Sequence, residues 1–402
     1  MKKLTTIIMA GGKGERLFPL TRDKAKPVIT FGGIYRILDF TLSNCLNSGI
    51  RRIYVLSQYG SFSLEQHLRQ AWDVMHPDLN EFIYSMPPQQ IMVNRWYRGT
   101  ADSIYQNLTL LEQERPRQVL ILSGDHVYKL NYREMMDFHL QHNADLTVAA
   151  VMVPRVEGSS FGILKVNEAS EVENFLEKPK DPPGLPDNPD FSLVSMGVYI
   201  FNAETLVEEV IKDAKKKTSK HDFGGDIIPQ MVGHKKVYAY NFQDPVTNTP
   251  RYWRDIGLLD AYFKAHQDLL GKAPVFELYD ADWPVRSKPQ LYPPSKYICS
   301  GSHVTVEDSL IASGCIIEGT VERSVLSPGV KVGVGATVCQ AILWDGVEVG
   351  SGAHIRQAII EEGVRVPPGF TIGLDHERDA KRFHVTENGV VVVPNNAVMV
   401  GD

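Results

Sequence analysis

The strongest constraint on the fold is an aliphatic repeat in the C-terminal part of the chain. Four sets of positions share a period of 17 residues: Val304, Val321, Val338, Ile355 and Ile372; Cys315, Val332, Val349 and Val366; Val325, Ile342 and Ile359; and Val330, Val347 and Val364. Within one unit the gaps are about six residues. A fixed period is typical of a solenoid whose turns bury their apolar faces against each other. We therefore predict a parallel β-helix of hexapeptide type. Each turn would consist of three hexapeptide units with one residue missing, which gives the period of 17 residues. Ordinary antiparallel strands are the alternative.

The N-terminal part, to about residue 260, alternates apolar runs with helix-like patterns. The expected strands are 5–9, 52–56, 119–122, 146–153 and 198–201, and the expected helices include 37–47, 64–72, 101–114 and 132–142. Strands that are apolar without alternation, separated by helices, predict a mostly parallel sheet covered on both faces. Ligands of such sheets bind beyond the carboxyl ends of the strands.

The length of 402 residues allows two or three domains. We expect an α/β domain over residues 1–275, a proline-rich linker over 276–296 and the coil over 297–402. The net charge of −6 argues against nucleic-acid binding. Four scattered cysteines indicate neither zinc nor disulfides and fit a reducing cytoplasm. The basic start and its short apolar run are interpreted as a first strand rather than a signal peptide, and no stretch predicts a membrane span.

A glycine-rich loop follows the first predicted strand. Gly11, Gly12 and Gly14 come directly after it, and Arg16 and Lys26 are close by. Glycines permit a positive φ and let backbone N–H groups surround an anion. The loop thus predicts a polyphosphate site, although a tight turn without a ligand has the same pattern. It matches neither the Walker sequence nor Gly-x-Gly-x-x-Gly.

Two acids and a lysine are further candidates. Asp125 follows the predicted strand 119–122, where a carboxylate suits a divalent metal beside substrate phosphates, or else caps the next helix. Asp255 is either a second metal ligand, a salt-bridge partner of Arg254, or the cap of a helix over residues 258–270. Lys178 precedes a proline, which we expect to hold its backbone extended, and it could bind a second phosphate or simply be solvated. We see no motif for a nucleophilic triad or a reactive cysteine.

When these motifs are taken together, the chain resembles the bacterial glucose-1-phosphate adenylyltransferase family along nearly its whole length. The resemblance is carried by residues 10–17, 25–27, 47–52, 96–102, 124–126, 160–162, 177–179, 195–197, 221–224 and 252–257. The glycine loop and Glu177-Lys178-Pro179 alone indicate only a sugar-phosphate nucleotidyltransferase. The segments 96–102, 221–224 and 252–257 are more specific. The implied fold is a Rossmann-like, GT-A-like α/β domain followed by a left-handed parallel β-helix.

The resemblance also implies roles for individual residues. Nucleotide binding would fall to Gly11, Gly12, Gly14, Arg16, Lys26 and Gln58, with Arg16, Lys26 and Asp125 catalytic. Asp125 and Asp255 would hold Mg²⁺. The sugar phosphate would be bound by Tyr97, Gly162, Glu177, Lys178, Ser195, Asp222, Phe223 and Trp253.

The implied reaction joins ATP and glucose 1-phosphate to ADP-glucose and pyrophosphate, the first committed step of glycogen biosynthesis. A cytoplasmic homotetramer with sugar-phosphate or nucleotide effectors is the implied assembly. Asp23 and Ile91 depart from the pattern of members activated by sugar bisphosphates. Two alternatives remain: an enzyme of the same fold making UDP-, GDP- or dTDP-sugars, and a catalytically silent regulatory subunit.

Overall fold

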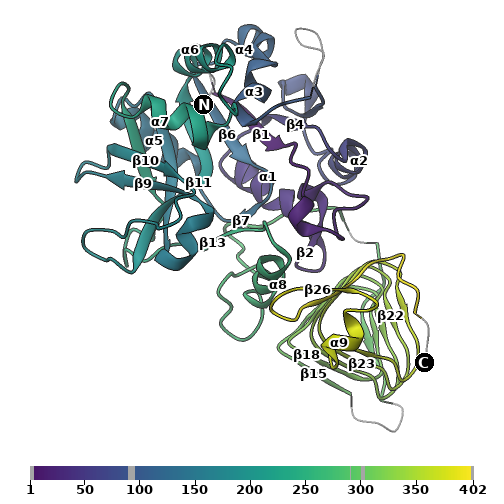
Figure 1. Ribbon diagram of the computed structural model, residues 1–402. Coiled ribbons are helices and arrows are strands. Elements are labelled where there is room, and N and C mark those ends of the chain that lie inside the picture. The colour runs from purple at the N-terminus through teal and green to yellow at the C-terminus, as the bar shows by residue number, and fades with distance from the viewer. Residues whose placement is uncertain (1–3, 89–95, 290, 300–303, 400–402) are drawn as a thin grey trace.

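The computed structural model describes residues 4–88, 96–289, 291–299 and 304–399, and Ile91 lies outside this part of the chain. The described chain forms an α/β domain and a C-terminal coil that lie side by side, with α8 (Leu259–Gln267) between them (Figure 1). None of the helices in the described residues is long and apolar enough to cross a membrane.

A nine-stranded sheet forms the centre of the described α/β domain. Its main path runs through β10 (Val172–Glu177), β9 (Gly162–Val166), β11 (Phe191–Asn202), β6 (Gln118–Ser123), β1 (Leu4–Ala10), β4 (Arg52–Ser57) and β5 (Phe82–Met86). β8 (Leu146–Pro154) pairs with β11, and β12 (Val237–Asn241) pairs with β8. The four strands from β6 to β5 are parallel, as the sequence predicts. β11 is antiparallel to its neighbours β6, β8 and β9, so the sheet as a whole is mixed.

Helices cover both faces of this sheet because its inner strands are apolar on both sides. In β1, Ile7 packs into the cluster that includes α3 (Thr100–Tyr105), α4 (Leu108–Glu114), α6 (Ala203–Ala214) and α7 (Ile228–Met231). Its neighbour Ile8 packs into the cluster that includes α1 (Ile37–Asn47), α2 (Ser61–Ala71) and α5 (Tyr132–Gln141). Successive side chains of a strand point to opposite faces, which is why one unbroken apolar run serves both layers.

One predicted helix is divided in two. The expected helix 101–114 is interrupted between Tyr105 and Leu108. The Asn107 side chain donates to the Ser103 carbonyl at 2.8 Å, and the Asn107 backbone N–H bonds Ile104 instead. An asparagine side chain can compete with the backbone in this way, and the helix breaks there.

The C-terminal part is a parallel β-helix, and most of the predicted register is confirmed. One row of strands is β15 (Thr305–Glu307), β18 (Thr320–Glu322), β21 (Thr337–Leu343), β23 (His354–Ile360) and β25 (Thr371–Ile372). Val321, Val338, Ile355 and Ile372 lie in register along it. The second row is β14 (Lys296–Tyr297), β17 (Ile316–Ile317), β20 (Lys331–Val332), β22 (Glu348–Val349) and β24 (Arg365–Val366).

The prediction is wrong for the first turn of the coil. Val306, not Val304, pairs with Val321, and Ile317, not Cys315, pairs with Val332. The first turn is two residues shorter than the turns that follow it. Counting back 17 residues from Val321 and Val332 therefore gives Val304 and Cys315, which are not their partners. Corner residues with positive φ show the same step: Arg323, Gln340 and Gln357 are 17 apart, whereas Asp308 is 15 before Arg323.

The remaining short elements join or close the two parts. β16 (Leu310–Ile311) and β19 (Val325–Leu326) extend the coil, and β26 (His384–Val385), β27 (Val391–Val393) and α9 (His376–Asp379) close its end. β2 (Thr30–Phe31) pairs with β3 (Tyr35–Arg36), and β7 (His126–Tyr128) pairs with β13 (Trp253–Asp255).

A shared hydrophobic core joins the coil to the α/β domain. Trp344 of the coil is fully buried and donates to the Tyr262 hydroxyl at 3.0 Å. Tyr262 in turn donates to the Thr30 carbonyl. Phe31, Phe40 and Ile359 belong to the same cluster. The predicted linker also packs against the α/β domain, since Trp283 donates to Asn44 at 2.8 Å.

We expect Val338→Asp to unfold the coil. Val338 is fully buried between Val321 and Ile355, so the substitution places an unpaired carboxylate in an apolar interior. The transition temperature should fall by several degrees or more, because each kilocalorie per mole corresponds to about 2–4 °C in a unit of roughly 150–250 residues and the loss here is several kilocalories per mole. Arg356→Asp, on an exposed coil position, is the control. An equal fall for both variants would contradict the inward placement of Val338.

Candidate functional site

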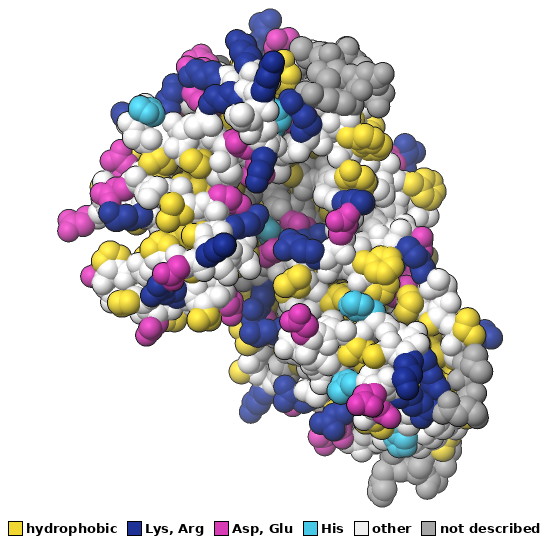
Figure 2. All heavy atoms as spheres, viewed as in Figure 1, with side chains coloured by type: hydrophobic (Ala, Val, Ile, Leu, Met, Phe, Trp, Pro, Cys, Tyr) yellow, Lys and Arg dark blue, Asp and Glu magenta, His cyan; other side chains and the backbone are white. Residues whose placement is uncertain are grey.

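Two adjacent cavities lie at the carboxyl ends of the central strands. The first, of about 270 Å³, is lined by residues that follow β1, β4 and β6 and by the start of α3, including Gly11, Gly12, Gln58, Tyr97, Thr100 and Asp125. The second, of about 220 Å³, includes Arg16, Gly162, Glu177, Lys178, Ser195, Asp222, Phe223, Trp253 and Asp255. Met9, Thr100 and Ser123 line both. Figure 2 shows a hollow on the face of the α/β domain, bordered by Lys and Arg side chains.

The glycine loop takes a form that partly differs from the expectation. Gly14 has φ +70°, and a Cβ there would lie 2.9 Å from Thr21 Cγ2, so this position requires glycine. Gly11 and Gly12 line the first cavity, and a Cβ at Gly11 would lie 3.3 Å from Gln58 Cβ. Gly14 is outside the lining of both cavities, where it turns the chain towards Arg16.

The charged centre of the site is Lys26. Its Nζ lies 2.5 Å from Asp125 Oδ2 and 3.5 Å from Asp255 Oδ1. The lysine expected at the nucleotide phosphates therefore lies between the two expected metal ligands. The alternative roles of these acids are not the ones observed: Asn131 caps α5, and Arg254 pairs with Asp268.

Opposing effects set the pKa values in this centre. Burial by itself would raise the pKa of Asp125, but the charges of Lys26 and His126, with hydrogen bonds from Lys26 and Ser123, hold it well below its usual range. Burial would lower the pKa of Lys26, but Asp125 and Asp255 raise it above its ordinary value. The cluster therefore holds the Asp125 carboxylate and the Lys26 ammonium in their charged forms at neutral pH.

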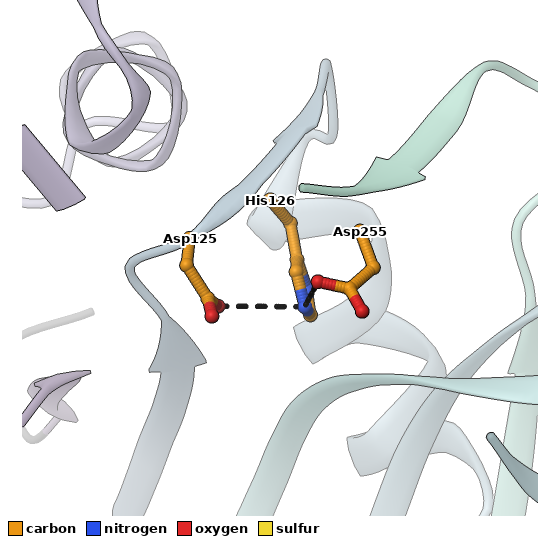
Figure 3. Close-up of side chains that lie close together, drawn as sticks. All are labelled: Asp125, His126 and Asp255. Carbon is orange, nitrogen blue, oxygen red and sulfur yellow. Dashed lines mark ion pairs between the residues drawn. The ribbon is translucent and has the colours of Figure 1, made fainter. Parts of the chain in front are cut away.

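His126 is a member of this centre that the sequence interpretation did not single out. Its Nε2 lies 3.4 Å from Asp125 Oδ1 and 3.7 Å from Asp255 Oδ1, and Figure 3 shows the ring between the two carboxylates. One ligand atom from each of the three residues fits within 4.8 Å of the others. Carboxylate pairs are the ligands that Mg²⁺ prefers, so the residues present fit the expected metal. The sequence signal was the position of His126, directly after Asp125.

Gln58 and Tyr97 contact each other across the first cavity. The Tyr97 backbone N–H donates to Gln58 Oε1 at 2.6 Å, and Gln58 Nε2 donates to the Tyr97 carbonyl at 3.4 Å. The Gln58 amide, expected at an adenine, is thus bonded to the main chain. Tyr97, expected at the sugar phosphate, lines the first cavity and not the second. Its hydroxyl accepts from Asn107 at 3.0 Å.

Lys178 lies at the rim of the second cavity in an unexpected backbone conformation. Its φ is +44°, so the extended form expected before Pro179 is wrong. β10 ends at Glu177, and the Lys178 N–H still donates to the Phe161 carbonyl at 3.0 Å, one residue beyond the Glu177–Gly162 pair, so the chain leaves the sheet at this residue. The side chain is 62 % exposed, and its Nζ pairs with Glu177 Oε1 at 2.9 Å.

The opposite wall of the second cavity comes from β11 and from residues 222–224. Ser195 lies 3.4 Å from the hydroxyl of Tyr199, a lining residue that sequence reasoning missed. A Cβ at Gly224 would lie 2.6 Å from Glu177 Oε2, so this glycine admits the Glu177 carboxylate. Arg16 comes from the glycine loop. Its guanidinium lies beside Gly257, where an added Cβ would be 3.2 Å from Arg16 Nη2. The structure thus brings cations and acids from six distant segments to one place.

Comparison with known proteins first defines the class. The Nucleotidyl transferase family matches residues 5–272, and the family described as GlmU-like, C-terminal hexapeptide, matches residues 293–393. The first match covers more than half of the chain, and a parallel-stranded domain with a glycine loop and paired acids agrees with it. The protein is therefore a nucleotidyltransferase with a hexapeptide-repeat domain.

Curated relatives then define the particular family. The chain is 47 % identical to the glucose-1-phosphate adenylyltransferase of Koribacter versatilis, over 96 % of this chain and 94 % of the relative. It is 45 % identical to glucose-1-phosphate adenylyltransferase 2 of Vibrio cholerae, over 98 % of both chains. The enzyme of the same name from Methylobacillus flagellatus is 44 % identical, over 98 % of this chain and 93 % of the relative. The chain belongs to the glucose-1-phosphate adenylyltransferase family.

We expect Lys26→Met to remove much of the stability that Asp125 contributes at neutral pH. In the parent, the lowered folded pKa stabilises the protein above the unfolded pKa, and this contribution is lost as the pH falls through the folded pKa. Without Lys26, a charge and a hydrogen bond that lower the folded pKa of Asp125 are gone, so this contribution becomes smaller. Thermal melts from acidic to neutral pH should therefore show a deficit of the variant relative to the parent that grows as the pH rises.

The control for this experiment is the double variant Lys26→Met with Asp125→Asn, which removes the group that titrates. Its melting temperature should depend on pH less than that of Lys26→Met. Parallel pH profiles for Lys26→Met and the parent would show that Lys26 does not set the pKa of Asp125.

Proposed function

We propose that the protein is a glucose-1-phosphate adenylyltransferase, which joins ATP and α-D-glucose 1-phosphate to ADP-glucose and releases pyrophosphate. The observation that carries this proposal is the pair of adjacent cavities with Lys26, Asp125 and Asp255 beside them. Two substrates that must react with each other need two cavities with a common wall. The names of relatives that align over nearly the full length supply the identity of those substrates.

The first cavity suits the nucleotide and the second the sugar phosphate. An oxygen of the sugar phosphate attacks the α-phosphorus of ATP in line, the bond to the β-phosphate breaks, and pyrophosphate leaves. Two polyanions must meet, so the chain contributes positioning and charge neutralisation rather than a covalent intermediate. Arg16 lies beside the boundary, and its guanidinium makes no ion pair among the described residues, which leaves it available to phosphate.

We further propose that Asp125 and Asp255 hold Mg²⁺, which when bound offsets phosphate charge. In the described structure the two acids are already held together by Lys26. The ammonium lowers the pKa of Asp125 and holds the two carboxylates close to each other, as metal ligands need to be.

The decisive assay is pyrophosphate release from ATP and glucose 1-phosphate with Mg²⁺ present. We expect turnover with ATP to exceed turnover with UTP, GTP and dTTP, and we expect a chelator to abolish it. Preference for another nucleotide would assign the chain to a different sugar nucleotide. Substrate binding without turnover would identify a silent regulatory subunit, against which the presence of Arg16, Lys26 and Asp125 argues.

Lys178 gives a more specific prediction. We propose that its ammonium leaves Glu177 to bind the phosphate of glucose 1-phosphate, because it lies at the rim of the second cavity. A hydrogen bond to a charged group contributes about 1.5–3 kcal/mol, so Lys178→Gln should raise the KM for glucose 1-phosphate by about ten- to a hundredfold. The KM for ATP should change little.

Lys180→Gln is the matched control, because Lys180 is an exposed lysine outside the lining of the second cavity. It should leave both KM values unchanged. Equal damage by Lys178→Gln to both substrates would show that Lys178 supports the fold or the shared transition state.

The resemblance supports three further proposals: a homotetramer, a cytoplasmic location, and regulation by sugar phosphates or nucleotides. Contacts between the glycine-loop region and the coil support the last of these. Lys24 pairs with Glu362 at 2.6 Å, and Arg22 donates to Asn395 at 2.6 Å. Light scattering of the purified protein and assays with candidate effectors test the assembly and the regulation.

A further inference from the structure

A buried histidine–aspartate pair lies behind the wall of the second cavity. His221 Nδ1 lies 2.6 Å from Asp213 Oδ2, and both residues are 2 % exposed. The other carboxylate oxygen of Asp213 accepts from the Ser219 hydroxyl at 2.6 Å, and Ser219 accepts from the His221 backbone N–H. The last turn of α6 thereby holds the chain that leads to Asp222.

The same pair fixes the backbone of His221 against the start of α3. His221 has φ +59°, a left-handed conformation that few non-glycine residues adopt, and its carbonyl accepts from Ala101 N–H at 2.8 Å. A Cβ at Gly99 would lie 2.3 Å from the His221 carbonyl oxygen. The two main chains therefore pack against each other at a glycine, with no side chain between them.

Thr100 carries this contact into both cavities. Its hydroxyl donates to Asp222 Oδ2 at 2.9 Å and accepts from the Phe223 N–H at 3.0 Å. Thr100 lines both cavities, whereas Asp222 and Phe223 line only the second. A displacement of residues 221–223 would thus move the wall of the second cavity directly, through Asp222 and Phe223, and would reach the first cavity only through Gly99 and Thr100.

From this geometry we propose that Asp213 and His221 are positioning residues for the sugar-phosphate site. They touch neither cavity themselves. They act through the His221 backbone, which sets the placement of Asp222 and Phe223 against Thr100. A wall displaced by about 1 Å can cost a hundredfold in rate, so a pair outside the site can determine how well the sugar phosphate is held. This inference rests on the proposed function, because glucose 1-phosphate is the probe.

The test compares two substitutions of the same histidine. In asparagine, the side-chain nitrogen stands the same number of bonds from Cα as Nδ1 does, and asparagine tolerates positive φ. His221→Asn should therefore keep the bond to Asp213 and most of the activity. In glutamine, the nitrogen stands one bond farther out. His221→Gln and Asp213→Ala should raise the KM for glucose 1-phosphate about tenfold or more, with a clearly smaller rise in the KM for ATP.

A buried pair elsewhere supplies the control. His67 Nε2 lies 2.6 Å from Asp39 Oδ1, and His67 lines neither cavity. His67→Asn breaks a pair of the same length, and it should lower the melting temperature without raising the KM for glucose 1-phosphate. If Asp213→Ala does not fold, the comparison of His221→Asn with His221→Gln still decides.

Three results would overturn the proposal: equal damage to both KM values, an unchanged KM for glucose 1-phosphate in His221→Gln and Asp213→Ala, or a His221→Asn variant as impaired as His221→Gln. Failure of the proposed function itself is a different result, because the unsubstituted protein would then fail to turn over ATP with glucose 1-phosphate.

Discussion

The ammonium of Lys26 holds together the parts of the chain that form the site. It comes from the short helix Lys26–Val28, while Asp125 follows β6 and Asp255 lies in β13. Because β13 pairs only with β7 among the described strands, Lys26 also fixes this small ribbon against the main sheet. Two carboxylates this close would repel each other and partly protonate without a cation. The buried charge therefore sets both the geometry and the ionisation of the centre.

The two sides of the site are constructed differently. In the first cavity, Gly11 and Gly12 present main chain, and Gln58 binds the main chain of Tyr97. In the second cavity, lining side chains bond each other, as Thr100 bonds Asp222. Backbone N–H groups can bind the negative charge of a phosphate. Polar side chains are better suited to a sugar ring, because they can hydrogen-bond its separate hydroxyls.

Local patterns in the sequence predicted most of the fold, because strand and helix periodicities depend on burial alone. The helix 37–47 and the coil register from Val321 onward were predicted at their observed positions. The errors arise where a contact overrides the local pattern. The Asn107 side chain breaks a helix, the first coil turn is two residues shorter, and Lys178 has a positive φ where the chain leaves β10. Likewise, sequence motifs identified Asp125 and Asp255, but the place of Lys26 between them depends on three distant segments.

The shared core around Tyr262 limits how far the two parts can be treated as modules. Hexapeptide coils are often regarded as appendages that one chain could exchange with another. Here the coil supplies Trp344 to a hydroxyl that also bonds the Thr30 carbonyl, four residues from Lys26. A substitute coil lacking an indole at that depth would leave the hydroxyl without its donor and the aromatic cluster open to water. The α/β domain and the coil therefore have to match at this join, and an exchanged coil would have to preserve both of its faces.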